Sequence, residues 1–156
     1  MRRRPAGPTT RSWWFALATL TIAACGDDGT GPDDSIDALI GSWDAIKMVV
    51  VNKANPSIAP DLTKLGVTFF VDIQPSGQYT AILTSFGQPT TEFGRVEVAN
   101  NQLTLHREQP GPARSDVGTY RISRDTLYLE GDTEFDFNFD GVAEPARLLT
   151  DFKKRD

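Results

Sequence analysis

Apolar residues recur at every second position along much of the chain, beginning at Val67. Val67, Phe69, Val71 and Ile73 would share one face of a strand. Alternation with a period of two, rather than 3.6, is typical of strands that bury one face. Turn-forming residues such as Gly, Pro, Asn and Asp interrupt the alternation, which indicates short connections between the strands. The main interruptions lie at 75–77, 87–89, 100–101 and 124–125.

This pattern predicts about nine short strands. A helical turn capped by Ser35 is expected at 36–40, and a short helix at 61–65. Within the first strand, Ile46, Met48 and Val50 are expected on one face. The predicted strands span 44–51, 67–73, 79–86, 92–98, 102–107, 118–123, 126–130, 134–139 and 146–153.

No long amphipathic helix separates any two of these predicted strands. Parallel pairing needs a crossover of roughly a dozen residues, so parallel βαβ units are excluded. Hairpin connections favour a barrel over a sandwich, because sandwiches usually need Greek-key crossovers. The predicted fold class is all-β, an antiparallel up-and-down meander of about 8–9 strands that closes into a barrel.

The N-terminal segment follows a different pattern. Four arginines precede the apolar run 13–24, and no acidic residue occurs before Asp27. The run is shorter than the ~20 apolar residues that cross a bilayer. Its charged start and its small residues at the end predict a secretory signal peptide over residues 1–24. The alternative, a buried core helix of a cytosolic protein, leaves the arginines and two tryptophans unexplained.

The signal segment ends in Ile22-Ala23-Ala24-Cys25, and Cys25 is the only cysteine of the chain. The four residues resemble the lipobox of bacterial lipoproteins, which implies that Cys25 is diacylated and becomes the mature N-terminus. The alternative is a free thiol or an intermolecular disulfide. Gly26 follows the cysteine, and by the enterobacterial sorting pattern this implies an outer-membrane protein that faces the periplasm.

Residues 26–35 contain no apolar side chain, so 25–35 is predicted to be the lipidated cysteine and a flexible acidic tether. The barrel domain is then 36–156. The chain has 16 basic and 21 acidic side chains, and four of the basic ones lie within 1–24, so the remainder has a formal charge of −9. Such a charge disfavours nucleic acid, whose phosphates need Lys and Arg. The predicted partners are a membrane through the lipid, a small hydrophobic ligand or an envelope protein.

A second resemblance begins at Gly41-Ser42-Trp43, which follows the expected helical turn and opens the first strand. The tripeptide resembles the Gly-X-Trp signature of lipocalins, and the domain is similar to small lipocalin-like domains of bacterial lipoproteins. The resemblance implies that Trp43 plugs the closed end of the barrel. It also implies an internal ligand cavity, for which the residues expected on inward faces are Trp43, Met48, Phe69, Val71, Leu83 and Leu105.

The segment 136–144 allows two exclusive interpretations. Asp136, Asn138 and Asp140, followed by glycine, are spaced like the first ligands of a calcium loop. Alternatively, three phenylalanines at 135, 137 and 139 form the buried face of a strand, which would spread the polar side chains over ~13 Å. The phenylalanine alternation favours the strand, so no metal site is predicted. An ion held at the turn by Asp140 and Glu144 stays open.

The sequence contains no recognisable motif for nucleophilic or zinc catalysis, and its many carboxylates have no marked spacing, which neither excludes nor supports a glycosidase pair. His106, the only histidine, is expected to face solvent, and no Gly-X-Ser-X-Gly motif accompanies it. Zinc would require further nitrogen or sulfur ligands. We therefore predict a non-enzymatic protein without a cofactor. Two functions remain: a lipid-anchored barrel that binds a small hydrophobic ligand, or an interaction lipoprotein whose packed barrel contacts another envelope protein.

Overall fold

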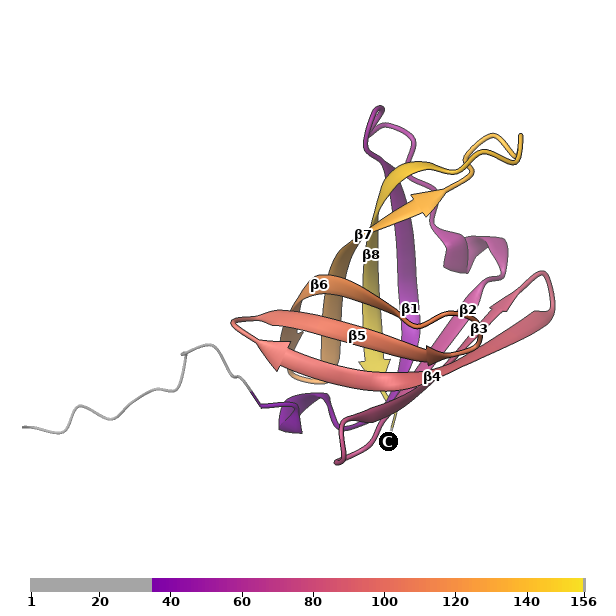
Figure 1. The fold of residues 1–156 in the computed structure, drawn as a ribbon. Coiled ribbons are helices and arrows are strands. Elements are labelled where there is room, and N and C mark those ends of the chain that lie inside the picture. Colours follow the sequence, from indigo (N-terminus) through magenta and orange to yellow (C-terminus); the bar gives the residue numbers. More distant parts are fainter. Residues whose placement is uncertain (1–34, 156) are drawn as a thin grey trace, which may run out of the picture.

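The computed structural model describes residues 35–155, which form an eight-stranded antiparallel barrel (Figure 1). Each strand pairs with the next, and β8 pairs with β1 to close the barrel. The predicted all-β up-and-down fold is confirmed. The strands are β1 Gly41–Asn52, β2 Thr68–Ile73, β3 Gln78–Ser85, β4 Gln88–Ala99, β5 Gln102–Gln109, β6 Arg114–Ser123, β7 Thr126–Phe135 and β8 Glu144–Lys154, with two 3₁₀ helices, η1 Asp37–Leu39 and η2 Leu62–Leu65.

The ninth predicted strand does not exist, because the segments expected at 126–130 and 134–139 belong partly to one strand. β7 continues through Gly131, which pairs with Gly118 of β6, and ends at Phe135. In the sequence, Gly131 and Asp132 interrupt the alternation of apolar residues and suggest a turn. In the structure the strand continues through them, because a glycine is tolerated in a strand where the neighbouring backbone approaches closely. No helix within residues 35–155 has the length and hydropathy needed to cross a membrane.

A bulge in β1 changes the face predicted for that strand. The pairing of β1 with β8 shifts register between Ala45 and Lys47. An extra residue in one strand reverses the alternation beyond it. As a result Ile46 is 57% exposed, whereas Met48 and Val50 are buried. The prediction that Ile46 shares their face is therefore wrong.

Trp43 lies in the core at one end of the barrel and is 1% exposed. Its Nε1–H donates a hydrogen bond to the carbonyl oxygen of Leu39, at the end of η1, over 2.8 Å. The predicted helical turn is confirmed by η1, but its N-cap is Ile36 and not Ser35; the Ser35 hydroxyl accepts from the Asp37 amide at 3.1 Å, one residue before the cap position. The indole and η1 thus close this end of the barrel.

The two ends of the barrel differ in their connections (Figure 1). At the end near η1, called the closed end, the strands are joined by short polar turns at 74–77, 100–101 and 124–125. The opposite end, called the loop end, carries the longer connections. Part of one of them pairs with β1, where the Val50 amide donates to Pro60 O and the Asn52 amide to Ile58 O. The loop-end connections span 53–67, 86–87, 110–113 and 136–143.

Candidate functional site

The barrel interior contains a small apolar cavity of about 30 Å³. Four of the six residues predicted for a ligand cavity line it, namely Trp43, Phe69, Val71 and Leu105. The other two do not: Met48 is buried elsewhere on the inner face, and Leu83 is 38% exposed. The predicted inward faces of the strands are therefore largely those that surround the cavity.

The volume of the cavity limits what it can hold. Sites for small molecules usually enclose ~300–1,000 Å³, and one water occupies ~10–15 Å³ of such space. The Phe69 and Phe152 rings both line the cavity, and their centroids are 5.6 Å apart. A cavity of about 30 Å³ has room for a few water molecules and not for an acyl chain unless these side chains move.

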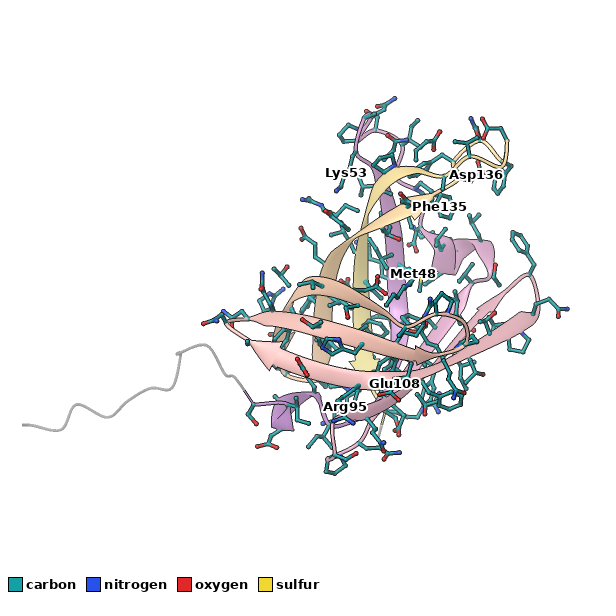
Figure 2. All side chains as sticks on the ribbon, in the orientation of Figure 1. Met48, Lys53, Arg95, Glu108, Phe135 and Asp136 are labelled. Atoms are coloured by element: carbon teal, nitrogen blue, oxygen red, sulfur yellow. The ribbon has the colours of Figure 1, made fainter. Side chains whose placement is uncertain are left out.

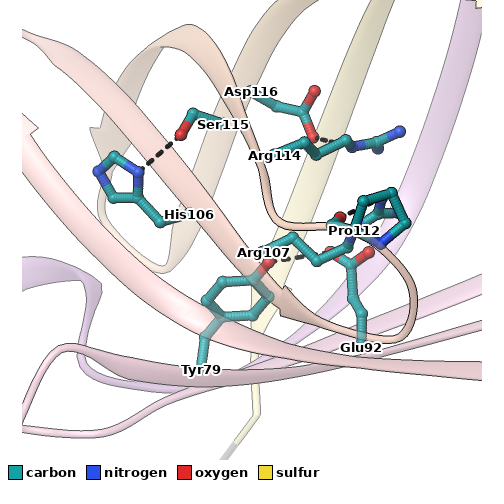
Figure 3. Close-up of polar contacts among 8 residues, drawn as sticks. All are labelled: Tyr79, Glu92, His106, Arg107, Pro112, Arg114, Ser115 and Asp116. Carbon is teal, nitrogen blue, oxygen red and sulfur yellow. Dashed lines mark hydrogen bonds and ion pairs between the residues drawn. The ribbon is translucent and has the colours of Figure 1, made fainter.

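A polar cluster lies beside this cavity on β3, β4, β5 and β6 (Figure 3). The Tyr79 hydroxyl donates to Glu92 Oε1 over 3.0 Å, and Tyr79 is 3% exposed. Burial, together with the negative charge of Glu92, raises the pKa of Tyr79 above its ordinary value, so the phenol stays neutral and keeps donating. Arg107 donates to Pro112 O over 3.3 Å, and Arg114 pairs with Asp116 over 2.8 Å.

Among residues 35–155, three buried polar atoms have no hydrogen-bond partner: Arg107 Nε, Thr150 Oγ1 and His106 Nε2. Thr150 is 1% exposed and pairs with Leu129, which lines the cavity. Leaving such a donor unsatisfied costs free energy, and a trapped water could supply a partner. The interior is therefore suited to water at one or two points and to apolar packing elsewhere.

Tyr79→Phe tests the polar cluster. Since the pKa of Tyr79 is raised in the folded chain, the unfolded chain loses the proton first, and stability should fall as the pH rises above about 10. The variant should lose about 1–2 kcal/mol at neutral pH, because Glu92 loses its donor. Its stability should then fall less steeply than that of the wild type in alkali. Urea unfolding at a series of pH values measures this, with Tyr128→Phe as the control. Parallel curves of stability against pH for Tyr79→Phe and the wild type would contradict the prediction.

A second polar arrangement on the outer face was missed by sequence reasoning. His106 Nδ1 lies 2.8 Å from Ser115 Oγ, and its Nε2 lies 3.1 Å from Glu97 Oε2. His106 lies on the outer face and is partly exposed, and a serine and an acid stand beside it, although the geometry of its Nε2 toward Glu97 does not make a hydrogen bond. The register of β5 and β6 places Ser115 directly opposite His106. No periodicity within one segment reveals such a pair, because it depends on how two strands align.

This Ser–His–Glu line lacks the surroundings that serine catalysis needs. Such catalysis depends on preorganised oxyanion donors in a water-excluded site. The side chains of His106 and Glu97 are 36% and 65% exposed. None of the three residues lines the interior cavity or the outer groove described next. The arrangement fits a hydrogen-bonded solvent face better than a catalytic centre.

A groove of about 390 Å³ lies on the barrel wall formed by β1, β6, β7 and β8. The Arg121 guanidinium stacks 3.9 Å above the centroid of the Tyr128 ring, and both residues line the groove. Glu130, a third lining residue, pairs with Arg147 over 3.2 Å. The volume suits a small molecule, but the aromatic face is already covered by Arg121, and both signs of charge are present.

The β7–β8 connection was predicted as a strand to residue 139, and this prediction is wrong. Residues 136–143 form a loop, and Phe139 has a φ of 59° and is 77% exposed. The physical reason is local: Asp136 accepts from the amides of Asp140 and Gly141, at 3.2 and 2.8 Å, and Asn138 accepts from Asp140. Short polar side chains that bond nearby amides favour turns over strands.

The same hydrogen bonds bear on the calcium interpretation. Asp140 Oδ1 accepts from the Val142 amide at 2.8 Å, and Glu144 Oε2 accepts from the Phe137 amide at 3.3 Å. The oxygens of Asp136, Asn138, Asp140 and Glu144 are thus engaged by the loop itself. Within residues 35–155, no group of three or more His, Cys, Asp or Glu side chains is placed to hold a metal ion.

The predicted signal peptide, the lipidation site Cys25 and nearly all of the tether lie outside the described residues. No protein-family model matches the chain, and no curated protein matches it in sequence. The crystal structure of Rv2717c from M. tuberculosis matches it with a TM-score of 0.39 and 16% identity, over 78% of this chain and 97% of that one. A likeness this distant assigns neither a family nor a function.

Proposed function

We propose that the chain is a non-enzymatic, lipid-anchored protein of the bacterial envelope, whose packed barrel acts by contacting a partner protein. The observation that carries this choice is the interior volume of about 30 Å³, which is far below the ~300 Å³ of a small-molecule site. Small barrels can fill their interior with side chains and still be stable folds. Binding then has to use the outer surface or the loops.

The lipid anchor is proposed from the sequence. Cys25 follows the apolar run and two small residues, and no other cysteine exists to pair with it. Acyl chains contribute ~0.8 kcal/mol per buried CH₂, so two or more hold a protein at a bilayer. The outer membrane, facing the periplasm, is the proposed location. Intact mass of membrane-extracted protein checks this, and an unmodified Cys25 would contradict the anchor.

The anchor would connect to the closed end of the barrel. The described chain enters through Ser35 and η1, which pack beside Trp43. The ten residues 26–35 can span at most ~35 Å. The loop end lies on the opposite side of the barrel from this attachment (Figure 1), so contacts with a partner are proposed there.

Binding of a small hydrophobic ligand is the second candidate, favoured by the apolar lining at Trp43, Phe69, Val71 and Leu105. Titrating residues 26–156 with fatty acids and retinoids separates the two functions, because Trp43 is the only tryptophan of this segment. We expect no saturable change in its fluorescence. A saturable change with one ligand per chain would favour the ligand-binding function and contradict the packed barrel.

A further inference from the structure

Large exposed apolar side chains are concentrated at the loop end. Nine such side chains occur among residues 35–155, and three of them, Ile46, Phe93 and Val117, lie on strands away from the barrel ends. None occurs in the closed-end turns at 74–77, 100–101 and 124–125. Of the remaining six, five belong to loop-end connections and Leu83 lies in β3 close to its loop end, and we call them the loop-end cluster: Ile58, Leu65, Leu83, Phe86, Phe139 and Val142.

Two members of the loop-end cluster occupy backbone positions that disfavour them. Phe86 has a φ of 51° and is 87% exposed, and Phe139 has a φ of 59° and is 77% exposed. The left-handed region is strained for a bulky residue and favours Gly, Asn or Asp. The closed-end turn at 100–101 follows this preference, with Asn100 and Asn101 at 52° and 61°, whereas Arg124 in the turn at 124–125 has a φ of 57°.

Neither folding nor solubility accounts for these two phenylalanines. Each adds backbone strain, and each exposes an aromatic ring without burying it in the chain. Residues that break local rules without a structural gain are concentrated at functional sites. Aromatic side chains are also among the residues that contribute most binding energy at protein interfaces.

Phe139 is held in place by its own loop. Asp136 Oδ2 accepts from the Gly141 amide in a hydrogen bond that spans Phe139, and Asp140 Oδ1 accepts from the Val142 amide directly after it, both at 2.8 Å. Figure 2 shows Asp136 at the loop end, beyond Phe135. A loop ordered before binding loses less conformational entropy when a partner arrives. This preorganisation suits an anchor that enters a specific pocket.

The charge around Phe139 narrows the class of partner. Residues 132–144 contain five acidic side chains and no Lys or Arg. At the start of this segment, Asp132 pairs with Lys53 of the neighbouring connection over 2.7 Å. A second copy that docked through the same loop would bring the same negative charge, and anionic lipid headgroups would be repelled as well. The complement is an apolar surface bordered by basic side chains.

We propose that Phe86 and Phe139 are the anchors of the loop end for a partner protein whose contact surface is apolar and bordered by Lys and Arg. This inference rests on the proposed function, and it identifies the loop end as the surface that contacts the partner protein. The partner approaches from the side opposite the attachment of the lipid tether. Loss of either anchor should weaken binding about tenfold or more.

Site-specific photocrosslinking in the full chain, inside the cells that produce it, tests the inference. A photoreactive amino acid replaces Phe86, Phe139, Asn100 or Arg124, four positions that share a positive φ. We expect positions 86 and 139 to form an adduct with one second polypeptide, and positions 100 and 124 to form none. Phe139→Asn should reduce the adduct from position 86 about tenfold. The crosslinked peptide should lie beside Lys or Arg.

A stability measurement separates lost contact from lost folding. Phe86→Asn and Phe139→Asn place a residue that tolerates the left-handed region, so the melting temperature should equal or exceed that of the wild type. A lower melting temperature for either variant would mean that its ring stabilises the fold, and this would overturn its role as an anchor.

Other adducts would overturn the inference in distinguishable ways. An adduct between two copies would identify self-association, and cosedimentation with phosphatidylcholine or phosphatidylglycerol vesicles that requires both phenylalanines would identify a bilayer. An adduct from only one position would overturn the claim for the other. If the photoreactive residue is placed at Tyr128 or Val117 and forms an adduct there, but forms none at 86 and 139, the proposed function would stand and the loop end would be ruled out as the contact surface. Saturable binding of a ligand by the interior would instead contradict the proposed function itself.

Discussion

Replacing Trp43 by alanine is expected to lower the free energy of unfolding by about 3–5 kcal/mol. Trp43 is 1% exposed and is among the largest fully buried side chains of residues 35–155. The substitution removes its packing and leaves the buried Leu39 carbonyl without its 2.8 Å donor. Since domains are stable by only ~5–15 kcal/mol, a loss of this size is a large part of the stability of the barrel.

Urea unfolding followed by far-UV circular dichroism measures the effect, because the variant has no tryptophan fluorescence in the barrel. Trp43→Phe keeps much of the apolar contact but loses the donor, and should cost about 1–3 kcal/mol. Ile46→Ala is the matched control on the same strand, since Ile46 is 57% exposed at the bulge, and should change stability by about 0.5 kcal/mol or less. Equal losses for Trp43→Ala and Ile46→Ala would show that the closed end does not depend on the indole.

Gly94→Ala is expected to cost about 3 kcal/mol or more, because β4 and β5 approach too closely for a side chain there. An added Cβ would overlap the carbonyl oxygen of His106 and lie 2.8 Å from Tyr79 Cε1. The backbone of β5 is paired with β4 and β6 and cannot move without loss of ladder hydrogen bonds. Displacing the Tyr79 ring would also disturb its hydrogen bond to Glu92.

Gly131→Ala is the control, and it should cost about 1 kcal/mol or less. An added Cβ at Gly131 would meet Val117 O at 3.4 Å and Gly118 Cα at 3.7 Å, which is ordinary contact. Alanine also loses less conformational entropy than glycine on folding. The comparison uses urea unfolding of both variants. Similar losses at Gly94 and Gly131 would mean that the penalty comes from the general use of glycine in strands and not from the contact with β5.

Several features of this protein were determined by the sequence alone. The period of two in 67–73 and 102–107 predicted strands, and the Pro, Gly and Asn turns predicted antiparallel neighbours, as β2 and β5 confirm. A strand presents alternate residues to opposite faces, so the inward positions Phe69, Val71 and Leu105 follow once a barrel is inferred. These features depend on interactions within a few residues, which a local pattern records.

Other features were decided only by the tertiary structure. The bulge that exposes Ile46 and the pair of Ser115 with His106 depend on the register between strands that are far apart in the sequence or joined by an irregular loop. Residues 136–143 form a loop, although the alternating phenylalanines predicted a strand, because Asp136 and Asn138 accept hydrogen bonds from the loop amides. The 30 Å³ cavity depends on how side chains from many strands fill one volume, and residue identities along a strand specify a face but not the space that remains between faces.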